Sequence, residues 1–115
     1  MAALTPFRQS GPTVLINAST SVNSSVQALS ADAVGNQQYV LTNSGTTLAF
    51  VAIGANAQQA IQNAVVPTLN PTGSPTCYPL LNGSQITITG PQNAYFAAIT
   101  LTGTDQIWVT PGYGQ

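Results

Sequence analysis

Two short runs of β-branched and aromatic residues flank a glycine near the C-terminus, and they constrain the fold more than any other stretch. The runs are Tyr95–Leu101 and Gln106–Thr110, with Gly103 between them. β-Branched and aromatic residues favour strands, and glycine can adopt the positive φ that short hairpin loops need. The pattern therefore predicts a β-hairpin over Pro91–Thr110.

Neither face of this predicted hairpin is purely polar. A two-residue turn at Gly103 puts Ile107 on the face of Phe96 and places Trp108 beside Ala97. A three-residue loop exchanges these partners, because a one-residue slip in register reverses every side chain. One face is expected in the core, while the other lies under a loop or contacts another subunit.

Turn signals divide much of the remaining chain into further short strands. The turn residues Asn43-Ser44-Gly45 tolerate positive φ and predict a second hairpin between the strands on either side. The expected strands are Thr13–Asn17, Ser24–Leu29, Gln37–Thr42, Thr47–Ile53 and Gln85–Thr89. With the C-terminal pair, this pattern of about eight short antiparallel strands predicts an all-β, single-domain β-sandwich or jelly roll.

The first residues are expected to form an extended N-terminal arm. In residues 1–12, Pro6, Gly11 and Pro12 interrupt regular structure, and the sandwich domain is expected over residues 13–115. The arm is either a frayed terminus or a strap on a neighbouring subunit, anchored by Phe7 and Arg8.

Three other segments depart from the strand pattern. Ala57–Val66 has helical spacing of its apolar residues and predicts a short helical turn leading into a strand end. Pro67–Pro79 carries four of the eight prolines and predicts a long surface loop, since proline cannot donate to a central sheet ladder. Pro111–Gln115 is expected to be an extended tail.

Charge is almost absent from the sequence. Charged residues make up 3% of the chain, and Arg8, Asp32 and Asp105 are the only ones; about 25% is usual. One cation cannot neutralise phosphates or anionic lipids, so nucleic acid and membrane surfaces are not expected partners. Because few like charges keep copies apart, the chain suits a larger assembly better than a concentrated monomer.

The residues for catalysis or metal binding are also missing from the sequence. There is no His, Lys or Glu, so we expect neither an acid–base pair nor an activated nucleophile. Hydrogen bonds within the predicted turn are enough to explain Asp105. Zinc would need several His or Cys ligands, and calcium would need more carboxylates than Asp32 and Asp105, although backbone carbonyls could contribute. We therefore expect no enzyme, catalytic residue, cofactor or metal, and we expect Cys77 to be a small buried hydrophobe. No signal peptide or membrane-spanning helix is expected either.

Three segments resemble a known group of proteins. They read Q-Y-V-L-T-N-S-G-T-T-L-A-F-V-A-I-G, then P-L-L-N-G-S, then A-Y-F-A-A-I-T-L-T-G-T-D-Q-I-W-V-T-P-G-Y-G. Their order is similar to small β-sandwich virion proteins of tailed bacteriophages, in which a turn–strand–turn core precedes a hairpin of the type A-x-I-x-x-x-G-T-x-x-I-x-V-T-P-G-x-G. The resemblance covers roughly Gln37–Gly114, with Pro67–Pro79 as an insertion.

The resemblance implies a structural role. Such proteins act as head decoration (cement) proteins or as small modules on tails and fibres, usually as homo-oligomers. It implies that this chain binds the major capsid protein and itself, as a dimer or trimer, on the outer surface of the virion after synthesis in the host cytoplasm. The resemblance defines no functional residues.

Physical reasoning adds a hypothesis about the interface. Phe7, Arg8 and whichever of Phe96 or Trp108 lies outside the core are the expected anchors. A carbohydrate-binding β-sandwich is the rival interpretation, because exposed aromatic rings stack on sugar faces. Aromatic side chains arranged on one exposed face would favour that rival.

Overall fold

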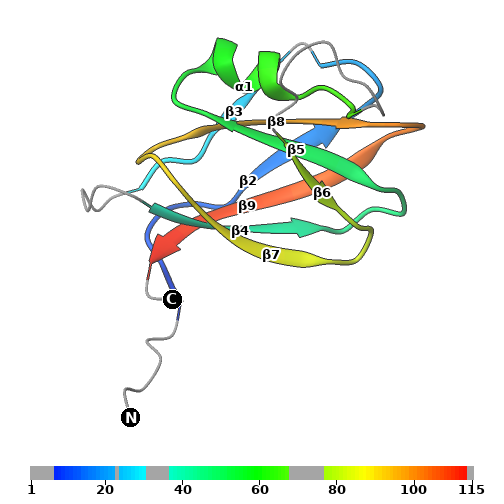
Figure 1. The fold of residues 1–115 in the computed structure, drawn as a ribbon. Helices are drawn as coiled ribbons and strands as arrows, with labels where there is room; N and C mark the ends of the chain where they lie inside the picture. The colour runs from blue at the N-terminus through cyan, green and yellow to red at the C-terminus, as the bar shows by residue number, and fades with distance from the viewer. Residues whose placement is uncertain (1–6, 23, 31–36, 68–76, 114–115) are drawn as a thin grey trace.

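A computed structural model of the chain describes residues 7–22, 24–30, 37–67 and 77–113, and within them it shows a β-sandwich (Figure 1). The five-stranded sheet contains β1 (Arg8–Gln9), β2 (Val14–Ala18), β9 (Asp105–Tyr113), β4 (Gln37–Asn43) and β7 (Gln85–Gly90). The four-stranded sheet contains β3 (Val26–Gln27), β8 (Tyr95–Thr100), β5 (Ala49–Gly54) and β6 (Tyr78–Leu80). One short helix, α1 (Ala57–Asn63), lies on the outer face of the four-stranded sheet.

Strands β2 to β9 follow the order of a jelly roll. In the five-stranded sheet they run β2-β9-β4-β7, and in the facing sheet they run β3-β8-β5-β6. All pairings between named strands are antiparallel. The predicted all-β sandwich is therefore confirmed, with the jelly-roll winding that eight strands can adopt.

Both predicted hairpins are wrong. β8 and β9 follow one another in the chain but belong to different sheets, and so do β4 and β5. A short glycine-containing connection can join strands side by side or face to face. Here it crosses between the sheets, because this turns the apolar sides of both strands toward one core: Phe96 and Ile107 are both fully buried there. Trp108 and Ala97 consequently lie on opposite outer faces of the sandwich.

The helical turn predicted within Ala57–Val66 is confirmed as α1, but the strand end expected after it is wrong, since residues 64–67 form no strand. Its N-cap is Asn56, whose Oδ1 accepts a 2.8 Å hydrogen bond from the backbone N–H of Gln59. Ala60 and Ala64 pack against Ala52 and Ala97 of the sheet below. These small side chains allow the helix to lie close to the sheet, which explains why β5 is buried on both faces.

Three predicted irregular segments form sheet structure instead. Pro79, expected in a loop, lies in β6, an edge strand in which the missing N–H of proline need not break a ladder hydrogen bond. Residues 68–76 of the predicted loop lie outside the described residues. The predicted tail continues β9, with Pro111 opposite Tyr39. The described part of the arm pairs with the same strand through β1, with Arg8 opposite Tyr113.

Candidate functional site

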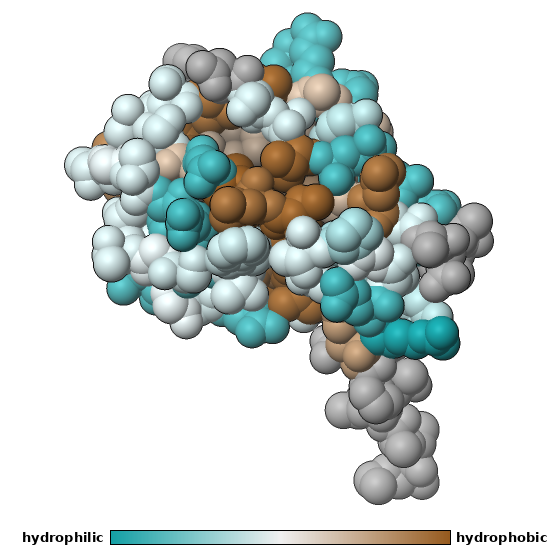
Figure 2. All heavy atoms as spheres, turned by 180° about the vertical axis from the view of Figure 1, so that it is seen from behind, coloured by the Kyte–Doolittle hydropathy of each residue, from teal (hydrophilic) through white to brown (hydrophobic). Residues whose placement is uncertain are grey.

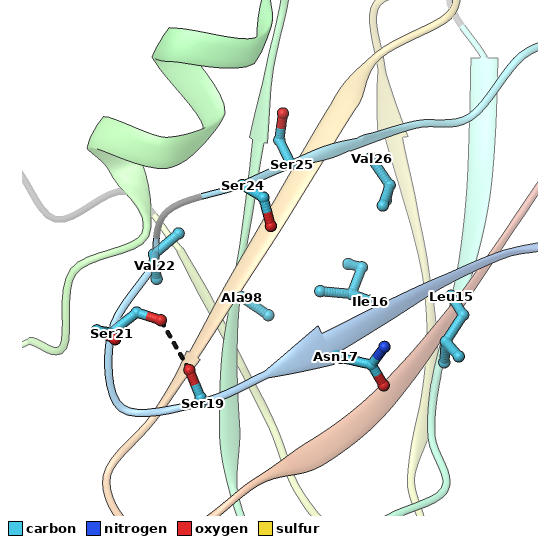
Figure 3. Close-up of a pocket in the computed structure, with 10 residues that line it drawn as sticks. All are labelled: Leu15, Ile16, Asn17, Ser19, Ser21, Val22, Ser24, Ser25, Val26 and Ala98. Carbon is cyan, nitrogen blue, oxygen red and sulfur yellow. Dashed lines mark hydrogen bonds between the residues drawn. The ribbon is translucent and has the colours of Figure 1, made fainter.

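The sandwich is open along the edge formed by β2 and β3. A hollow of about 170 Å³ lies there, with Ile16 of one sheet and Ala98 of the other among its lining residues (Figure 3). Seen from behind the view of Figure 1, hydrophobic residues gather at the centre of the molecular surface and more hydrophilic residues surround them (Figure 2). We call this hollow the edge groove; the full lining is Leu15, Ile16, Asn17, Ser19, Ser21, Val22, Ser24, Ser25, Val26 and Ala98.

The edge groove exists because β3 is too short to cover its neighbour. β3 pairs with β8 only at Tyr95 and Phe96, and the next contact along β8 is a bridge between Ser19 and Ile99. Between these points β8 has no partner strand on this side among the described residues, and Ala98 lines the groove. The rim carries serine hydroxyls, one of which (Ser19 Oγ) donates a 2.8 Å hydrogen bond to the Ser21 carbonyl. The lining is therefore mixed, with apolar side chains such as Ile16 and Ala98 beside uncharged polar ones, and it suits an uncharged segment of a partner.

The outer face of the five-stranded sheet carries the only tryptophan. Trp108 is 38% exposed and lies between Leu15 of β2 and Thr42 of β4 in the sheet register. Its Nε1 donates a 2.8 Å hydrogen bond to Ser44 Oγ, which fixes the ring orientation. This face therefore presents one large aromatic ring, oriented by a hydrogen bond, among uncharged neighbours.

Phe7 lies on the same outer face, next to a second shallow groove. A Cβ built on Gly112 would be 2.3 Å from Cζ of Phe7, so the ring packs directly on that glycine. The groove, which we call the face groove, has a volume of about 350 Å³ and is lined by Phe7, Gln9, Val40, Thr42, Gln85 and Thr110. The Thr42 and Gln85 side chains form no hydrogen bond with any residue that the structure describes, so they are available to a ligand.

The four residues expected at an interface do not lie together. Phe96 is fully buried in the core, so its prediction as an interface residue is wrong. Trp108 lies outside the core instead. Phe7 and Arg8 are held by their own chain: the Arg8 guanidinium lies 5.6 Å from the centroid of the Tyr113 ring. The edge groove was not predicted, because it arises from strand pairing that the local sequence does not reveal.

The carboxylates and the cysteine give no catalytic arrangement within the described residues. Asp32 lies outside them, and Asp105 is buried with Oδ1 accepting a hydrogen bond from the Gln106 N–H, 2.9 Å away. The described residues contain no group of three or more His, Cys, Asp or Glu side chains that could hold a metal ion. Cys77 is half-buried beside α1, and its thiol donates a 3.4 Å hydrogen bond to the Val65 carbonyl. Burial raises the pKa of this thiol.

Comparisons with known proteins identify no relative of this chain. No family model matches the chain, no curated protein matches it, and no solved structure matches it. Among the described residues, no helix has the length and apolar character needed to cross a membrane.

Proposed function

We propose that this chain is a structural protein of a tailed-bacteriophage particle, a capsid decoration protein that binds the major capsid protein lattice as a homo-oligomer. The observation that carries the proposal is a surface with almost no charge that nevertheless presents the exposed aromatic ring of Trp108. The edge groove adds an uncharged hollow lined by both apolar and serine side chains. The sequence resemblance to small virion proteins points in the same direction.

Docking by such surfaces depends on shape and apolar burial rather than on reactivity. Apolar burial contributes about 25 cal/mol per Å², and a buried tryptophan at the centre of an interface is a typical hot spot worth about 2 kcal/mol or more. A protein that binds only the assembled lattice stabilises that lattice by mass action. With so few charges, little of the attraction is lost to screening by salt.

The proposal is tested by co-sedimentation of the purified chain with capsids that lack it. Trp108→Ala should weaken binding roughly 30-fold or more, the equivalent of a hot spot of about 2 kcal/mol. Leu81→Ala removes another exposed apolar side chain and serves as the matched control, with binding expected within about twofold of the parent. Binding should persist from low salt to about 1 M NaCl.

Two results would count against this function. A steep loss of binding as salt rises would show that charge, not apolar contact, holds the complex. Binding to isolated tails or fibres but not to capsids would move the chain to the other virion position that the resemblance implies. Sedimentation velocity of the free chain tests the homo-oligomer.

A second function, binding of neutral carbohydrate, is favoured by one observation. Phe7 and Trp108 share the outer face of the five-stranded sheet, and the face groove offers the uncharged side chains of Thr42 and Gln85. Aromatic rings stack on sugar faces, while amides and hydroxyls bond to sugar hydroxyls. Because Trp108 is the only tryptophan, its fluorescence during titration with cellohexaose or maltohexaose reports directly on this face.

The control for carbohydrate binding is a pair of glutamine variants. Gln85→Ala alters the face groove and should reduce a saturable fluorescence change at least severalfold. Gln58→Ala alters an exposed position on α1 and should not. No saturable change with either oligosaccharide would reject this second function and leave the first intact.

A further inference from the structure

Asp105 is a buried carboxylate that the described residues only half satisfy. It is the first residue of β9, and its side chain is 4% exposed. Oδ1 accepts the hydrogen bond from the N–H of Gln106, whereas Oδ2 is buried and accepts none from any described residue. Leaving a buried carboxylate oxygen without a partner is costly, so this atom calls for an explanation.

The turn that covers Asp105 does not supply the missing partner. A Cβ built on Gly45 would lie 1.5 Å from Asp105 Oδ1, so the connection between β4 and β5 passes directly over the carboxylate. Two of its backbone donors are engaged elsewhere. The Gly45 N–H donates to Asn43 Oδ1 at 3.0 Å, and the Ser44 N–H donates to the Gln106 carbonyl at 3.1 Å.

No cationic side chain of the chain lies near this carboxylate. Arg8 is the sole Lys or Arg, and the sequence has no His. Arg8 pairs with Tyr113 at the opposite end of β9, which places it roughly 26 Å from Asp105 at about 3.3 Å per strand residue. A positively charged side chain beside Asp105 must therefore come from outside the chain.

The surroundings of Asp105 suit a cation. It lines a hollow of about 510 Å³ at the end of the sandwich, together with hydroxyl and amide side chains of Asn17, Ser19, Thr46, Thr104 and Gln106. These are neutral oxygen donors of the kind that coordinate hard metal ions and accept hydrogen bonds from ammonium or guanidinium groups. A single carboxylate would balance one positive charge and would bind calcium only weakly.

We propose that this hollow binds a cation supplied from outside the chain, with Asp105 as its anionic ligand. The cation is a metal ion such as Ca²⁺ or the ammonium or guanidinium group of another chain's Lys or Arg. Because Oδ2 is buried, binding is coupled to a small displacement that opens this atom to the hollow. This inference does not depend on the virion role.

The experiment measures thermal unfolding of the full chain with CaCl2, with L-argininamide, and with NaCl at matched ionic strength. At tenfold excess over its Kd, a bound cation should raise Tm by roughly 5 °C. Asp105→Asn keeps the shape but removes the charge, so it should abolish the rise. Asp32→Asn removes the chain's other side-chain carboxylate and is the matched control, which should respond like the parent.

Each outcome bears on the proposal. A saturable rise with CaCl2 alone identifies a metal site, and one with argininamide alone identifies a side-chain site; both support it when Asp105→Asn removes the effect. Amide chemical shifts of Gly45, Thr104 and Gln106 should move in the same titration. No saturable rise with either cation, or an equal rise in parent and Asp105→Asn, overturns the proposal. Without added cation, Asp105→Asn should melt no lower than the parent, since it removes an uncompensated buried charge.

Discussion

The rings of Tyr39 and Phe96 meet edge to face, with centroids 4.9 Å apart and planes inclined at 68°. Tyr39 belongs to the five-stranded sheet and Phe96 to the four-stranded sheet, so this contact joins the two layers at their centre. The Tyr39 hydroxyl donates to the Pro91 carbonyl and accepts a 3.1 Å hydrogen bond from the Ala94 N–H. One side chain thus fixes both the spacing of the sheets and the entry into β8.

Replacing Phe96 tests its place in the core. Phe96→Ala should lower the free energy of unfolding by roughly 3–5 kcal/mol, because it leaves a cavity where both sheets pack. The measurement is urea denaturation followed by circular dichroism. Leu101→Ala, at an exposed position in the connection to β9, should change the stability by no more than about 0.5 kcal/mol. A small effect of Phe96→Ala on stability with a large effect on self-association would instead place this ring at an interface.

Tyr39 should make the fold sensitive to alkaline pH. Burial raises the pKa of its hydroxyl above the ordinary value of 10.0, and the backbone hydrogen bonds with Ala94 and Asn93 offset this only in part. Above pH 10 the unfolded chain releases this proton while the folded chain retains it, so stability falls as pH rises from 10 toward the raised value. The check is urea denaturation between pH 8 and 11. Tyr39→Phe should remove this part of the slope; an unchanged slope would contradict the assignment.

Gly45 should be intolerant of any side chain. Gly45→Ala places a methyl group on the carboxylate of Asp105 and should cost roughly 1–3 kcal/mol of stability, as overpacking does. The cause is steric, so the penalty should fall below about 1 kcal/mol when Asp105→Ala is introduced as well. A double-mutant cycle by urea denaturation measures this coupling. Strictly additive effects would show that the two residues do not meet.

Cys77 should react slowly for a cysteine of its exposure. Burial raises the pKa of its thiol above the ordinary value of 9.0, and the hydrogen bond with the Val65 carbonyl lowers the pKa by a smaller amount. Because only the thiolate reacts, a raised pKa slows the reaction. Alkylation by iodoacetamide at pH 8 should be severalfold slower in the folded chain than in the chain unfolded in urea. Equal rates in the two states would mean that the structure around Cys77 does not protect it.

The sequence by itself determined the class of fold and the character of the surface. Alternating apolar residues and turn signals located β2, β4, β5, β7, β8 and β9 to within a few residues, because strand periodicity and turn chemistry are local properties. The spacing at Ala57–Asn63 also located the helix. The near absence of charge followed from counting residues.

Strand pairing was decided only by the tertiary structure. The turns at Gly45 and Gly103 are compatible with a hairpin or with a crossing between sheets, and the local energy of the turn does not distinguish them. What distinguishes them is which arrangement buries the most apolar surface, and this depends on strands far away in the chain. That choice buried Phe96, exposed Trp108, opened the edge groove and enclosed Asp105, so every candidate site on this protein is a consequence of long-range packing.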